Sequence, residues 1–538
     1  MPRLRSKIDA KSDTFTRNRE AMLELVSEFR TLEGKVREHS ASKAGKFQKR
    51  GQLLPRQRVE RLLDRGAPFL ELSTLAGYKM HDDDGKSAIA GGSNIIGIGF
   101  VQGRRCLVSA SDSAIKGGAI SPMGLRKTLR AQEIALQNKL PTINLVESAG
   151  ANLIYQSELF VEGGRVFANM ARLSAAGLPL ITVVHGSSTA GGAYIPGLSD
   201  YVIVVRGRSK IFLAGPPLVK AALGEDAEEE ALGGAEMHAK VAGTAEYIAE
   251  SDGDAIAVAR ELMEKVHWDQ VRTDAPAPVV PPLYDPDELA GAVPVDYGEP
   301  YDVREIIARI VDGSDFLDFG RDYGPQTVCG HARIEGHACG IIGNNGPIFA
   351  DGAAKAGHFI QACCQSGTPI IYLQNTTGYM VGTQAEQAGI VKHGAKMIQA
   401  VANATVPQIT VLVGGAFGAG NYGMCGRAFD PRFIFAWPNA RVSVMGGAQA
   451  AKVMEIITVA KFARQGVEIP PENLEKMTGA IRDKLDSESG ALFASARIWD
   501  DGIIDPRDTR RVLGMSLATC REAATRSTHA NTFGVARF

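Results

Sequence analysis

The chain has 538 residues, of which 45% are hydrophobic and 22% charged, and its formal net charge is −1. This length predicts two large domains or several smaller ones. So neutral a charge balance argues against nucleic acid or an anionic membrane as the main partner, and no apolar run reaches the roughly 18 residues typical of a transmembrane helix. With 60 glycines, the composition is typical of a globular α/β protein with many tight turns.

The cysteines and the N-terminus indicate an intracellular protein. Cys363 and Cys364 are adjacent, and seven cysteines in so long a chain do not form the dense pattern of a disulfide framework. The basic stretch MPRLRSK is followed by no apolar segment, and Asp9 and Asp13 argue against a transit peptide. We therefore expect reduced thiols and a cytoplasmic location.

The pattern of apolar residues changes twice along the chain. Helical spacing between Met22 and Leu32 predicts helices in an N-terminal segment, residues 1–65. From about residue 92 onward, short apolar strands are separated by glycines. Residues 273–286, TDAPAPVVPPLYDP, hold five prolines without periodicity, so we place a linker over 273–300. This linker separates a first large domain, 66–272, from a second, 301–538.

Two glycine-rich stretches resemble each other, STAGGAY at Ser188–Tyr194 and AFGAGNY at Ala416–Tyr422. The two tyrosines are 228 residues apart (422 − 194). The same separation joins five further identical pairs, namely Lys127 and Lys355, Pro141 and Pro369, Gly150 and Gly378, Pro179 and Pro407, and Gly186 and Gly414. A constant offset without gaps predicts a tandem duplication, and therefore two similar domains.

Each copy shows the same order of predicted elements. PTINLVESAG precedes a helical stretch through Met170, and LPLITVVHG then leads into the first glycine stretch. In the second copy PIIYLQNTTG, a helical stretch through Ala400 and VPQITVLVGG lead into the second. Strands that alternate with helices predict layers of largely parallel, buried strands. The glycines fall where a strand passes into a helix.

Such a turn presents unpaired backbone N–H groups, which suit an anion. Neither copy has the GxxxxGK[ST] phosphate loop, and no GxGxxG is followed by the expected acidic residue. The alternative anion is transient, the enolate or oxyanion of a thioester, for which each donor contributes about 2.7 to 4 kcal/mol in the transition state. Tight packing of helix on strand is the other interpretation of the two turns.

Few side chains beside these turns are candidates for catalysis. No GxSxG elbow is present, and His185, which precedes the first turn, corresponds to Val413 in the second copy. Core packing is the simpler interpretation of a lone histidine on a buried strand. Glu158 and Glu386 keep the 228 offset and fit either acid–base work or a structural role at a helix start.

Two Cys–His pairs, Cys329 with His331 and His337 with Cys339, allow two interpretations. They match a loose zinc motif, or they belong to two strands of a β-hairpin. Zinc motifs usually carry a tighter CxxC pair, so the hairpin is favoured. We expect no metal site.

Five stretches together resemble one family, the carboxyltransferase (β) subunits of biotin-dependent acyl-CoA carboxylases. They are GSSTAGGAYIPGLSDYVIV, FLAGPPLVKAALGE, QNTTGYMVG, GAFGAGNYGMCGRAFDPRFIFAWPNARVSVMGG and ASARIWDDGIIDPRDTRRVLG. The resemblance extends from about residue 20 to 515. AGNYGMCG, residues 419–426, resembles the methylcrotonoyl-CoA and geranyl-CoA branch more than the propionyl-CoA branch.

The resemblance implies two tandem crotonase-like domains, a β hexamer, and active sites where the N-domain of one subunit faces the C-domain of another. It also implies two enolates, one on the thioester and one on the biotin ureido ring, and therefore a use for two oxyanion holes. Gly191 and Gly192 would hold the thioester oxygen, and Ala419 and Gly420 the biotin oxygen. The biotin enolate would itself remove the substrate proton, so that no side-chain base is required.

Further residues follow from the same resemblance or from charge. On the acyl-CoA side they are Gly150, Gly163, Ala190 and, as ligands of the CoA phosphates, Lys116, Arg126 and Lys127; on the biotin side they are Gly378, Gly418 and Tyr422. Neither the biotinyl Met-Lys-Met motif nor an ATP-binding loop is present. We therefore expect carboxybiotin to come from a separate α subunit with a biotin carboxylase and a carrier domain, in an α6β6 assembly.

One departure from the family concerns the substrate. Methylcrotonoyl-type sequences tend to carry Phe-Gly-Arg where this chain has Gly163-Gly164-Arg165. Losing the ring would open the pocket, so geranyl-CoA is the favoured substrate and methylcrotonoyl-CoA the alternative; drift at a surface position is the other explanation of the glycine. A crotonase-type hydratase or isomerase that uses Glu158 or Glu386, and an idle scaffold subunit, are the competing functions.

The pure chain is expected to bind acyl-CoA but to fix no bicarbonate, because its sequence has neither a biotin attachment motif nor an ATP-binding loop. The check is ATP-dependent incorporation of labelled bicarbonate with and without a biotin-carrying partner. Carboxylation by the pure chain would contradict this expectation.

Overall fold

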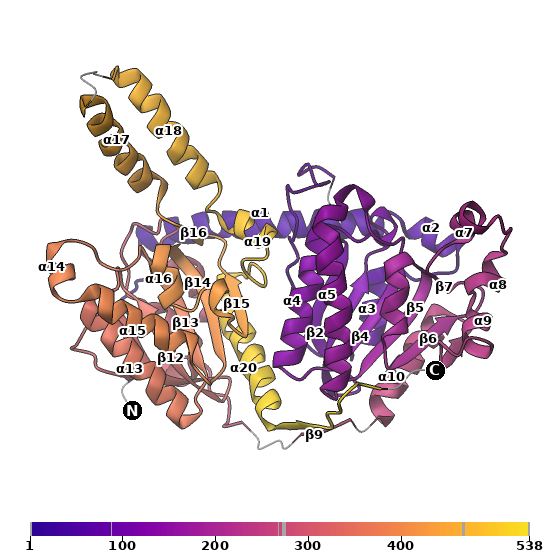
Figure 1. Cartoon of the computed structure of the whole chain (residues 1–538). Helices are drawn as coiled ribbons and strands as arrows, with labels where there is room; N and C mark the ends of the chain where they lie inside the picture. Colours follow the sequence, from indigo (N-terminus) through magenta and orange to yellow (C-terminus); the bar gives the residue numbers. More distant parts are fainter. Residues whose placement is uncertain (1–2, 88, 267, 272–275, 465–468, 536–538) are drawn as a thin grey trace. The chain divides into compact units, whose positions relative to one another are not determined.

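The structure, a computed structural model, describes residues 3–87, 89–266, 268–271, 276–464 and 469–535 (Figure 1). The chain divides into two compact units. We call Thr31–Asp274, Ala496–Ile498 and Thr519–Phe538 the N-unit, and Met1–Arg30, Ala275–Ser495 and Trp499–Ala518 the C-unit. From residue 276 to 285 the chain forms no helix or strand, whereas residues 272–275 of the expected linker lie outside the described residues.

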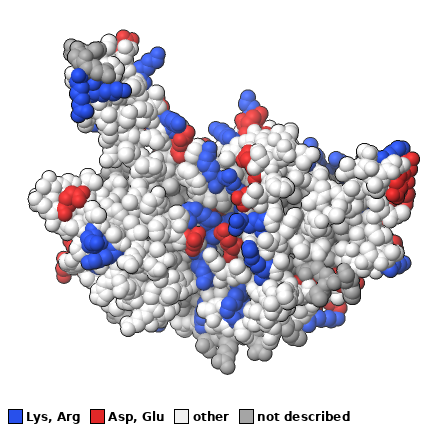
Figure 2. Space-filling view, in the orientation of Figure 1, with Lys and Arg blue, Asp and Glu red and all other residues white. Residues whose placement is uncertain are grey.

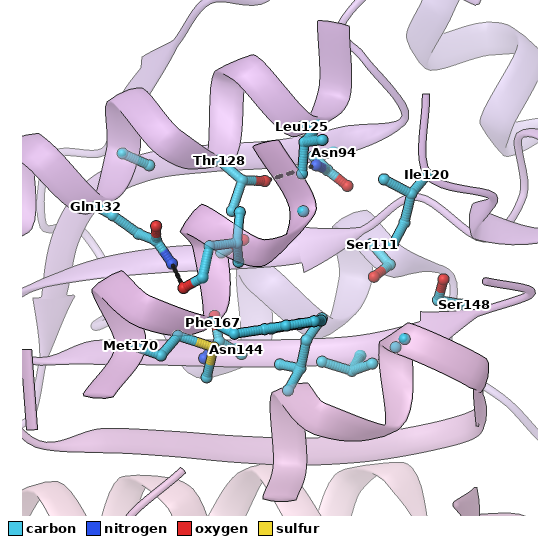
Figure 3. A pocket seen from close by; sticks show the side chains of 18 of the residues that line it. Asn94, Ser111, Ile120, Leu125, Thr128, Gln132, Asn144, Ser148, Phe167 and Met170 are labelled. Carbon is cyan, nitrogen blue, oxygen red and sulfur yellow. Dashed lines mark hydrogen bonds between the residues drawn. The ribbon is translucent and has the colours of Figure 1, made fainter. Parts of the chain in front are cut away.

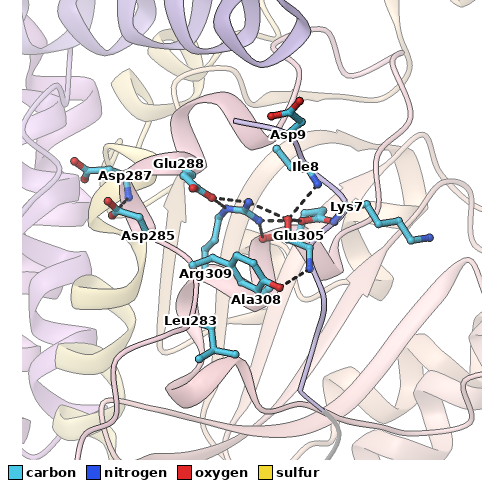
Figure 4. A network of polar contacts seen from close by, with 12 residues as sticks. Lys7, Ile8, Asp9, Leu283, Asp285, Asp287, Glu288, Glu305, Ala308 and Arg309 are labelled. Carbon is cyan, nitrogen blue, oxygen red and sulfur yellow. Dashed lines mark hydrogen bonds and ion pairs between the residues drawn. The ribbon is translucent and has the colours of Figure 1, made fainter. Parts of the chain in front are cut away.

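This division differs from the expected boundaries at both ends of the chain. Residues 1–30 belong to the C-unit, where Ser6 donates to Glu305 over 2.6 Å and Arg309 binds Glu288 over 2.7 Å (Figure 4). The backbone N–H of Lys7 also donates to Glu305. Residues 519–538 belong to the N-unit, where β17 pairs with β9. Contacts between residues that are far apart in the sequence set both boundaries, so no local sequence pattern predicts them.

The N-unit holds one large sheet with strand order β1-β2-β3-β4-β5-β6-β8, with β7 paired to β5. The pairs from β3 to β8 are parallel and the first two are antiparallel. Its elements are α2 Ala44–Lys49, α3 Pro55–Leu62, β1 Leu70–Leu72, β2 Asn94–Val101, β3 Arg104–Ser111, α4 Pro122–Gln137, β4 Thr142–Ser148, α5 Gln156–Ala175, β5 Leu180–Thr189, the 3-10 helix η3 Ala190–Ala193, α6 Tyr194–Gly197, β6 Tyr201–Val205, β7 Lys210–Phe212, α7 Pro216–Leu223, α8 Glu229–Gly233, α9 Ala235–Lys240, β8 Tyr247–Ala249, α10 Asp252–Lys265, β9 Asp269–Val271 and β17 Arg526–Thr528.

The C-unit repeats this plan with strand order β10-β11-β12-β13-β14-β15, and β16 pairs with β14. Its elements are α11 Leu289–Ala292, α12 Arg304–Ile310, β10 Leu317–Asp318, β11 Thr327–Ile334, β12 His337–Asn344, α13 Ala350–Ser366, β13 Ile370–Thr376, α14 Thr383–Gln387, α15 Ile390–Ala402, β14 Gln408–Phe417, α16 Gly418–Gly423, β15 Phe433–Ala436, β16 Arg441–Ser443, α17 Gly447–Arg464, α18 Pro471–Ser487 and α19 Ala491–Ala496. Two further helices, α1 Asp13–Ala41 and α20 Thr509–Thr525, complete the chain.

The 228 offset found in the sequence recurs in the backbone. β4 and β13 begin and end at positions that differ by this number, as do β5 and β14. Pairing of β4 with β5 breaks between Val146 and Ser148, and pairing of β13 with β14 breaks at the matching place, between Gln374 and Thr376. The strands of the two units thus begin, end and break their pairing at matching positions, which supports the tandem duplication. The predicted α/β fold is confirmed.

The core of the N-unit lies between the sheet and helices α3 and α10. It contains Val59 and Leu62 of α3, Ile256 and Leu262 of α10, and inward-facing strand residues such as Val183. Helices α4 and α5 cover the other face of this sheet (Figure 1). Because successive strand residues point to opposite faces, every second residue of β3 and β4 faces α4 and α5 instead of this core.

On the face shown in Figure 2, Lys and Arg side chains are interspersed with Asp and Glu. No helix in the described part of the chain is long and apolar enough to span a membrane.

The hairpin interpretation of the Cys–His pairs is confirmed, because β11 and β12 are antiparallel with Ile334 opposite His337. The described ranges contain no cluster of three or more metal-binding side chains.

Candidate active site

A cavity of about 560 Å³ lies in the N-unit between β3, β4 and the two covering helices (Figure 3). Ser109 and Ser111 of β3 and Asn144 and Ser148 of β4 line it, whereas their neighbour Ile143 belongs to the core on the other face. The twofold period of a strand explains this alternation. The sheet therefore supplies a partly polar floor to the cavity.

The two covering helices supply its walls. Helix α4 begins at Pro122, where the Ser121 side chain accepts from the backbone N–H of Gly124, and this cap fixes the start of the helix. Residues three, four or seven positions apart share a helix face. The cavity-lining residues follow that spacing, with Leu125, Thr128 and Gln132 on α4 and Gly163, Val166, Phe167 and Met170 on α5. Most of this wall is apolar.

The first glycine turn opens onto this cavity. Gly191 and Gly192 line it, and a Cβ placed on Gly191 would lie 3.7 Å from the Phe167 ring. Ala190 has φ 53°, a left-handed conformation that costs a non-glycine residue about 1 to 2 kcal/mol. Gly150 lies next to it, since their Cβ positions would be 3.8 Å apart. The structure thus brings together four predicted residues of the acyl-CoA side, and Gly163 lines the same cavity.

The second glycine turn has the same backbone. Gly418 has φ 52°, which matches Ala190, and Gly420 packs on Gly378 so closely that a Cβ would lie 2.8 Å from the Gly378 Cα. Ala419 is exposed and Gly420 buried, as are their counterparts Gly191 and Gly192. Tyr422 is 47% exposed and its counterpart Tyr194 is 46% exposed, so even the side chains after the turn lie alike.

A second cavity, of about 660 Å³, lies in the C-unit. Phe349, Met380, Val381 and His393 are among its lining residues. The five residues predicted for the biotin side, which are Gly378, Gly418, Ala419, Gly420 and Tyr422, are not among them. The geometry of the second turn therefore supports the biotin-side assignment, whereas this cavity does not include the turn.

Lys127 must be withdrawn from the predicted CoA ligands. Its side chain is only 2% exposed, and its ammonium donates to the carbonyl oxygens of Gly91 and Asn94 over 3.2 and 2.7 Å. Burial lowers its pKa to about 8. Lys355 at the matching position donates to the carbonyl of Gly320, so the repeated lysine is a structural feature of the fold.

The other charged candidates differ from one another. Lys116 forms an ion pair of 2.7 Å with Asp82, and Arg126 is exposed on α4. Glu158 lies 3.1 Å from His81 and does not line the cavity. Glu386 is exposed on α14. Neither glutamate is placed as a general base at the first turn.

Sequence reasoning missed the hydroxyl groups that support both turns. Ser148 accepts from the N–H of Gly150 over 3.1 Å and donates to the carbonyl of Gly118 over 2.9 Å. Thr376 accepts from the N–H of Gly378 over 3.2 Å. The sequence does indicate these hydroxyl groups. A hydroxyl residue stands two positions before the matched glycine both in SAG, residues 148–150, and in TTG, residues 376–378.

Comparisons with known proteins agree with this geometry. The carboxyl transferase domain family matches residues 46–535. The chain is 49% identical over 489 residues to a probable biotin-dependent acyl-coenzyme A carboxylase beta2 subunit of Mycobacterium tuberculosis, with 91% of each chain covered. It is 46% identical over 554 residues to a probable mitochondrial methylcrotonoyl-CoA carboxylase beta chain of Drosophila melanogaster, with 99% of this chain and 95% of that one covered.

Among solved structures, the beta subunit of P. aeruginosa geranyl-CoA carboxylase is 60% identical, with both chains covered completely and a TM-score of 0.93. These matches define the chain as a carboxyl transferase with a crotonase-like α/β fold. The chain belongs to the carboxyltransferase β subunits of the biotin-dependent acyl-CoA carboxylases, which confirms the resemblance found in the sequence. The hydratase, isomerase and idle-scaffold alternatives are not supported.

Replacing Lys127 with Met should destabilise the fold by about 1 to 3 kcal/mol, because two buried carbonyl groups lose their donor. The KM for acyl-CoA should stay unchanged, because the ammonium is buried against backbone. Thermal unfolding and steady-state kinetics are the measurements. Arg126→Met is the contrasting variant: Arg126 is exposed and stays a predicted CoA ligand, so its loss should raise the KM with little loss of stability. A raised KM without loss of stability in the Lys127 variant would restore it as a CoA ligand.

Proposed function

We propose that this chain transfers the carboxyl group of carboxybiotin to a branched enoyl-CoA, with geranyl-CoA as the preferred substrate. The observation that carries this proposal is the largely apolar cavity that ends at Gly191 and Gly192. An engineered cavity of about 150 Å³ holds benzene, so a carbon atom occupies about 25 Å³. On that scale a five-carbon methylcrotonoyl chain occupies about 125 Å³ and a ten-carbon geranyl chain about 250 Å³. Only the longer chain fills a substantial part of 560 Å³.

Gly163 is the residue through which the cavity is proposed to select chain length. It lies in the interior of α5 and lines the cavity, and, apart from its chain neighbours and the backbone of its own helix, no atom lies within 4 Å of the position its Cβ would occupy. A glycine inside a helix costs about 1 kcal/mol relative to alanine. The open space beside Gly163 would accommodate a longer acyl chain, and this functional gain offsets the cost. The 60% identity to a geranyl-CoA carboxylase beta subunit supports the same substrate.

The two glycine turns are proposed to stabilise two different oxygen atoms. The N–H groups of Gly191 and Gly192 hold the thioester oxygen as the substrate becomes an enolate. The N–H groups of Ala419 and Gly420 hold the ureido oxygen of the biotin ring. Bound carboxybiotin supplies the activated carboxyl group. Preorganised backbone donors of this kind require no reorganisation when the charge develops, and neither Glu158 nor Glu386 is needed as a base.

The partner assignments extend this proposal. A biotin-carrying α subunit delivers the carboxybiotin, and six copies of this chain form the core of an α6β6 assembly located in the cytoplasm. Large apolar side chains are exposed at the start of α5, where Leu153, Ile154, Phe160 and Val161 are each at least 70% exposed. Large exposed apolar side chains that lie close together in the sequence favour an interface between proteins, and they support self-association.

Replacing Gly192 with Pro removes one backbone donor and should lower kcat by about a hundredfold. The measurement is carboxylation by the complete enzyme, together with thermal unfolding to show that the variant is folded. Gly192→Ala is the matched control, since it keeps the N–H and its Cβ would find its nearest atom at 3.6 Å; it should lose far less activity. A proline variant with the wild-type rate would refute the assignment of the first turn.

Replacing Gly163 with Phe should abolish geranyl-CoA carboxylation by filling the cavity, while methylcrotonoyl-CoA carboxylation persists or improves. The measurement is kcat/KM for both thioesters in both proteins. Ala168→Phe is the control, because it places the same ring on an exposed position of the same helix. If the Gly163 variant keeps its geranyl-CoA activity, this residue does not select chain length, and methylcrotonoyl-CoA becomes the better assignment.

A further inference from the structure

Four ionisable side chains form a buried cluster in the N-unit, behind the first glycine turn. They are Arg58 of α3, Glu147 of β4, His185 of β5 and Asp252 of α10. Arg58 binds Glu147 over 2.8 Å and Asp252 over 3.3 Å. His185 is fully buried, and its Nδ1 lies 2.9 Å from the Asp252 carboxylate. Burial, together with Arg58, lowers the pKa of His185, so the imidazole is neutral and its Nδ1–H donates to Asp252.

The cluster lies at the break in pairing between β4 and β5. Val146 pairs with Val184, and pairing resumes with Ser148 opposite Ser188. Three residues of β5, His185 to Ser187, therefore stand against the single residue Glu147. Extra residues in one strand change its direction and re-aim the side chains and backbone that follow. Here the residues that follow are those of the glycine turn.

Contacts with Gln52, Gly186 and Ser113 hold the break between β4 and β5 in shape. Gln52 donates its amide N–H groups to the His185 carbonyl oxygen over 3.0 Å and to Glu147 over 3.2 Å. Gly186 approaches Glu147 so closely that a Cβ would lie 2.8 Å from its Cγ. Ser113 donates to the other oxygen of Glu147 over 2.8 Å. The backbone of both strands is thus fixed by groups from outside the sheet.

The C-unit builds the same break with uncharged residues at the positions of Glu147 and His185. Asn375 stands where Glu147 does, and its side-chain oxygen accepts from the N–H of Gly415 over 2.9 Å. Val413 stands where His185 does. Burying charged groups carries a desolvation cost that apolar replacements avoid. Because the second repeat shows that the fold does not need the charges, their presence in the first repeat calls for another explanation.

Two short chains of contacts lead from the cluster to the turn. Glu147 precedes Ser148, which binds the N–H of Gly150 and the carbonyl of Gly118. His185 is the first residue of β5 in the break, and pairing with β4 resumes at Ser188. The Ser188 hydroxyl donates to the Gly192 carbonyl over 2.9 Å. We infer that Glu147 and His185 are positioning residues that aim the first turn at the thioester oxygen. This inference rests on the proposed role of Gly191 and Gly192.

The test replaces His185 with Val, the residue that the second repeat carries. The expected result is a kcat lower by about ten- to a hundredfold, with the KM for acyl-CoA within about twofold, because the lost contacts act on the transition state and not on substrate binding. His185→Asn, which retains an N–H donor toward Asp252, should restore most of the rate. Gln52→Ala, at a half-buried loop position, should lower kcat in the same way and serves if the valine variant does not fold.

Ser174→Ala is the matched control. Ser174 donates to Asp200 over 2.6 Å, and Asp200 holds the N–H of Leu180 at the other end of β5. This variant loses a buried hydrogen bond of the same unit and should lose stability while keeping its kcat. A rate that falls equally in Ser174→Ala, or that does not fall in folded His185→Val or Gln52→Ala, would overturn the positioning role. A rate lost in Gly192→Pro but kept in His185→Val would retain the first turn and reject this inference alone.

Discussion

Two parallel strands, β4 and β5, fall out of register just before the first turn begins. Over residues 142–146 their ladder is regular, and it resumes only at Ser148 and Ser188. The break leaves three residues of β5, His185 to Ser187, outside the regular pairing with β4. The chain then leaves β5 through Ala190, whose left-handed φ of 53° persists because the surrounding contacts over-determine it. Gly191 and Gly192 follow Ala190 and line the cavity, so the register break and the cavity-lining turn belong to one short stretch of chain.

The position of the cavity follows from two simple periods. Along β4 every second residue faces α4 and α5, which places Asn144 and Ser148 on the floor of the cavity and Ile143 in the core behind it. Along α5 the helical period places Gly163, Phe167 and Met170 on one wall. Neither period by itself predicts a hollow, since facing residues normally interdigitate at high density. The hollow remains although large apolar residues such as Leu125, Phe167 and Met170 line it, with Gly163, Gly191 and Gly192 among the small residues of its lining.

The sequence was sufficient to predict the strands, the two turns and their offset, because these depend on local patterns of apolar residues and glycines. It was not sufficient to predict the environment of the Lys127 side chain. In the sequence, a lysine on a helix is the same whether its ammonium faces water or the carbonyl of Asn94. The attachment of the N-terminal residues to the C-unit also escaped it, since the contacts of Ser6 and Lys7 with Glu305 join segments about 300 residues apart. The cavity itself depends on residues from strands, helices and turns that lie between Asn94 and Ile195, and only their assembly shows it.

The two repeats have diverged around a backbone that stayed the same. Ala190 and Gly418 share one conformation although only the glycine adopts it without strain, and a charged cluster in one repeat corresponds to Asn375 and Val413 in the other. Such divergence is possible because the proposed donors belong to the backbone and not to side chains. Substitutions change what surrounds each turn, and therefore which oxygen atom reaches it, without removing the donors themselves. A duplicated fold can in this way apply one kind of electrostatic stabilisation to two chemically different substrates.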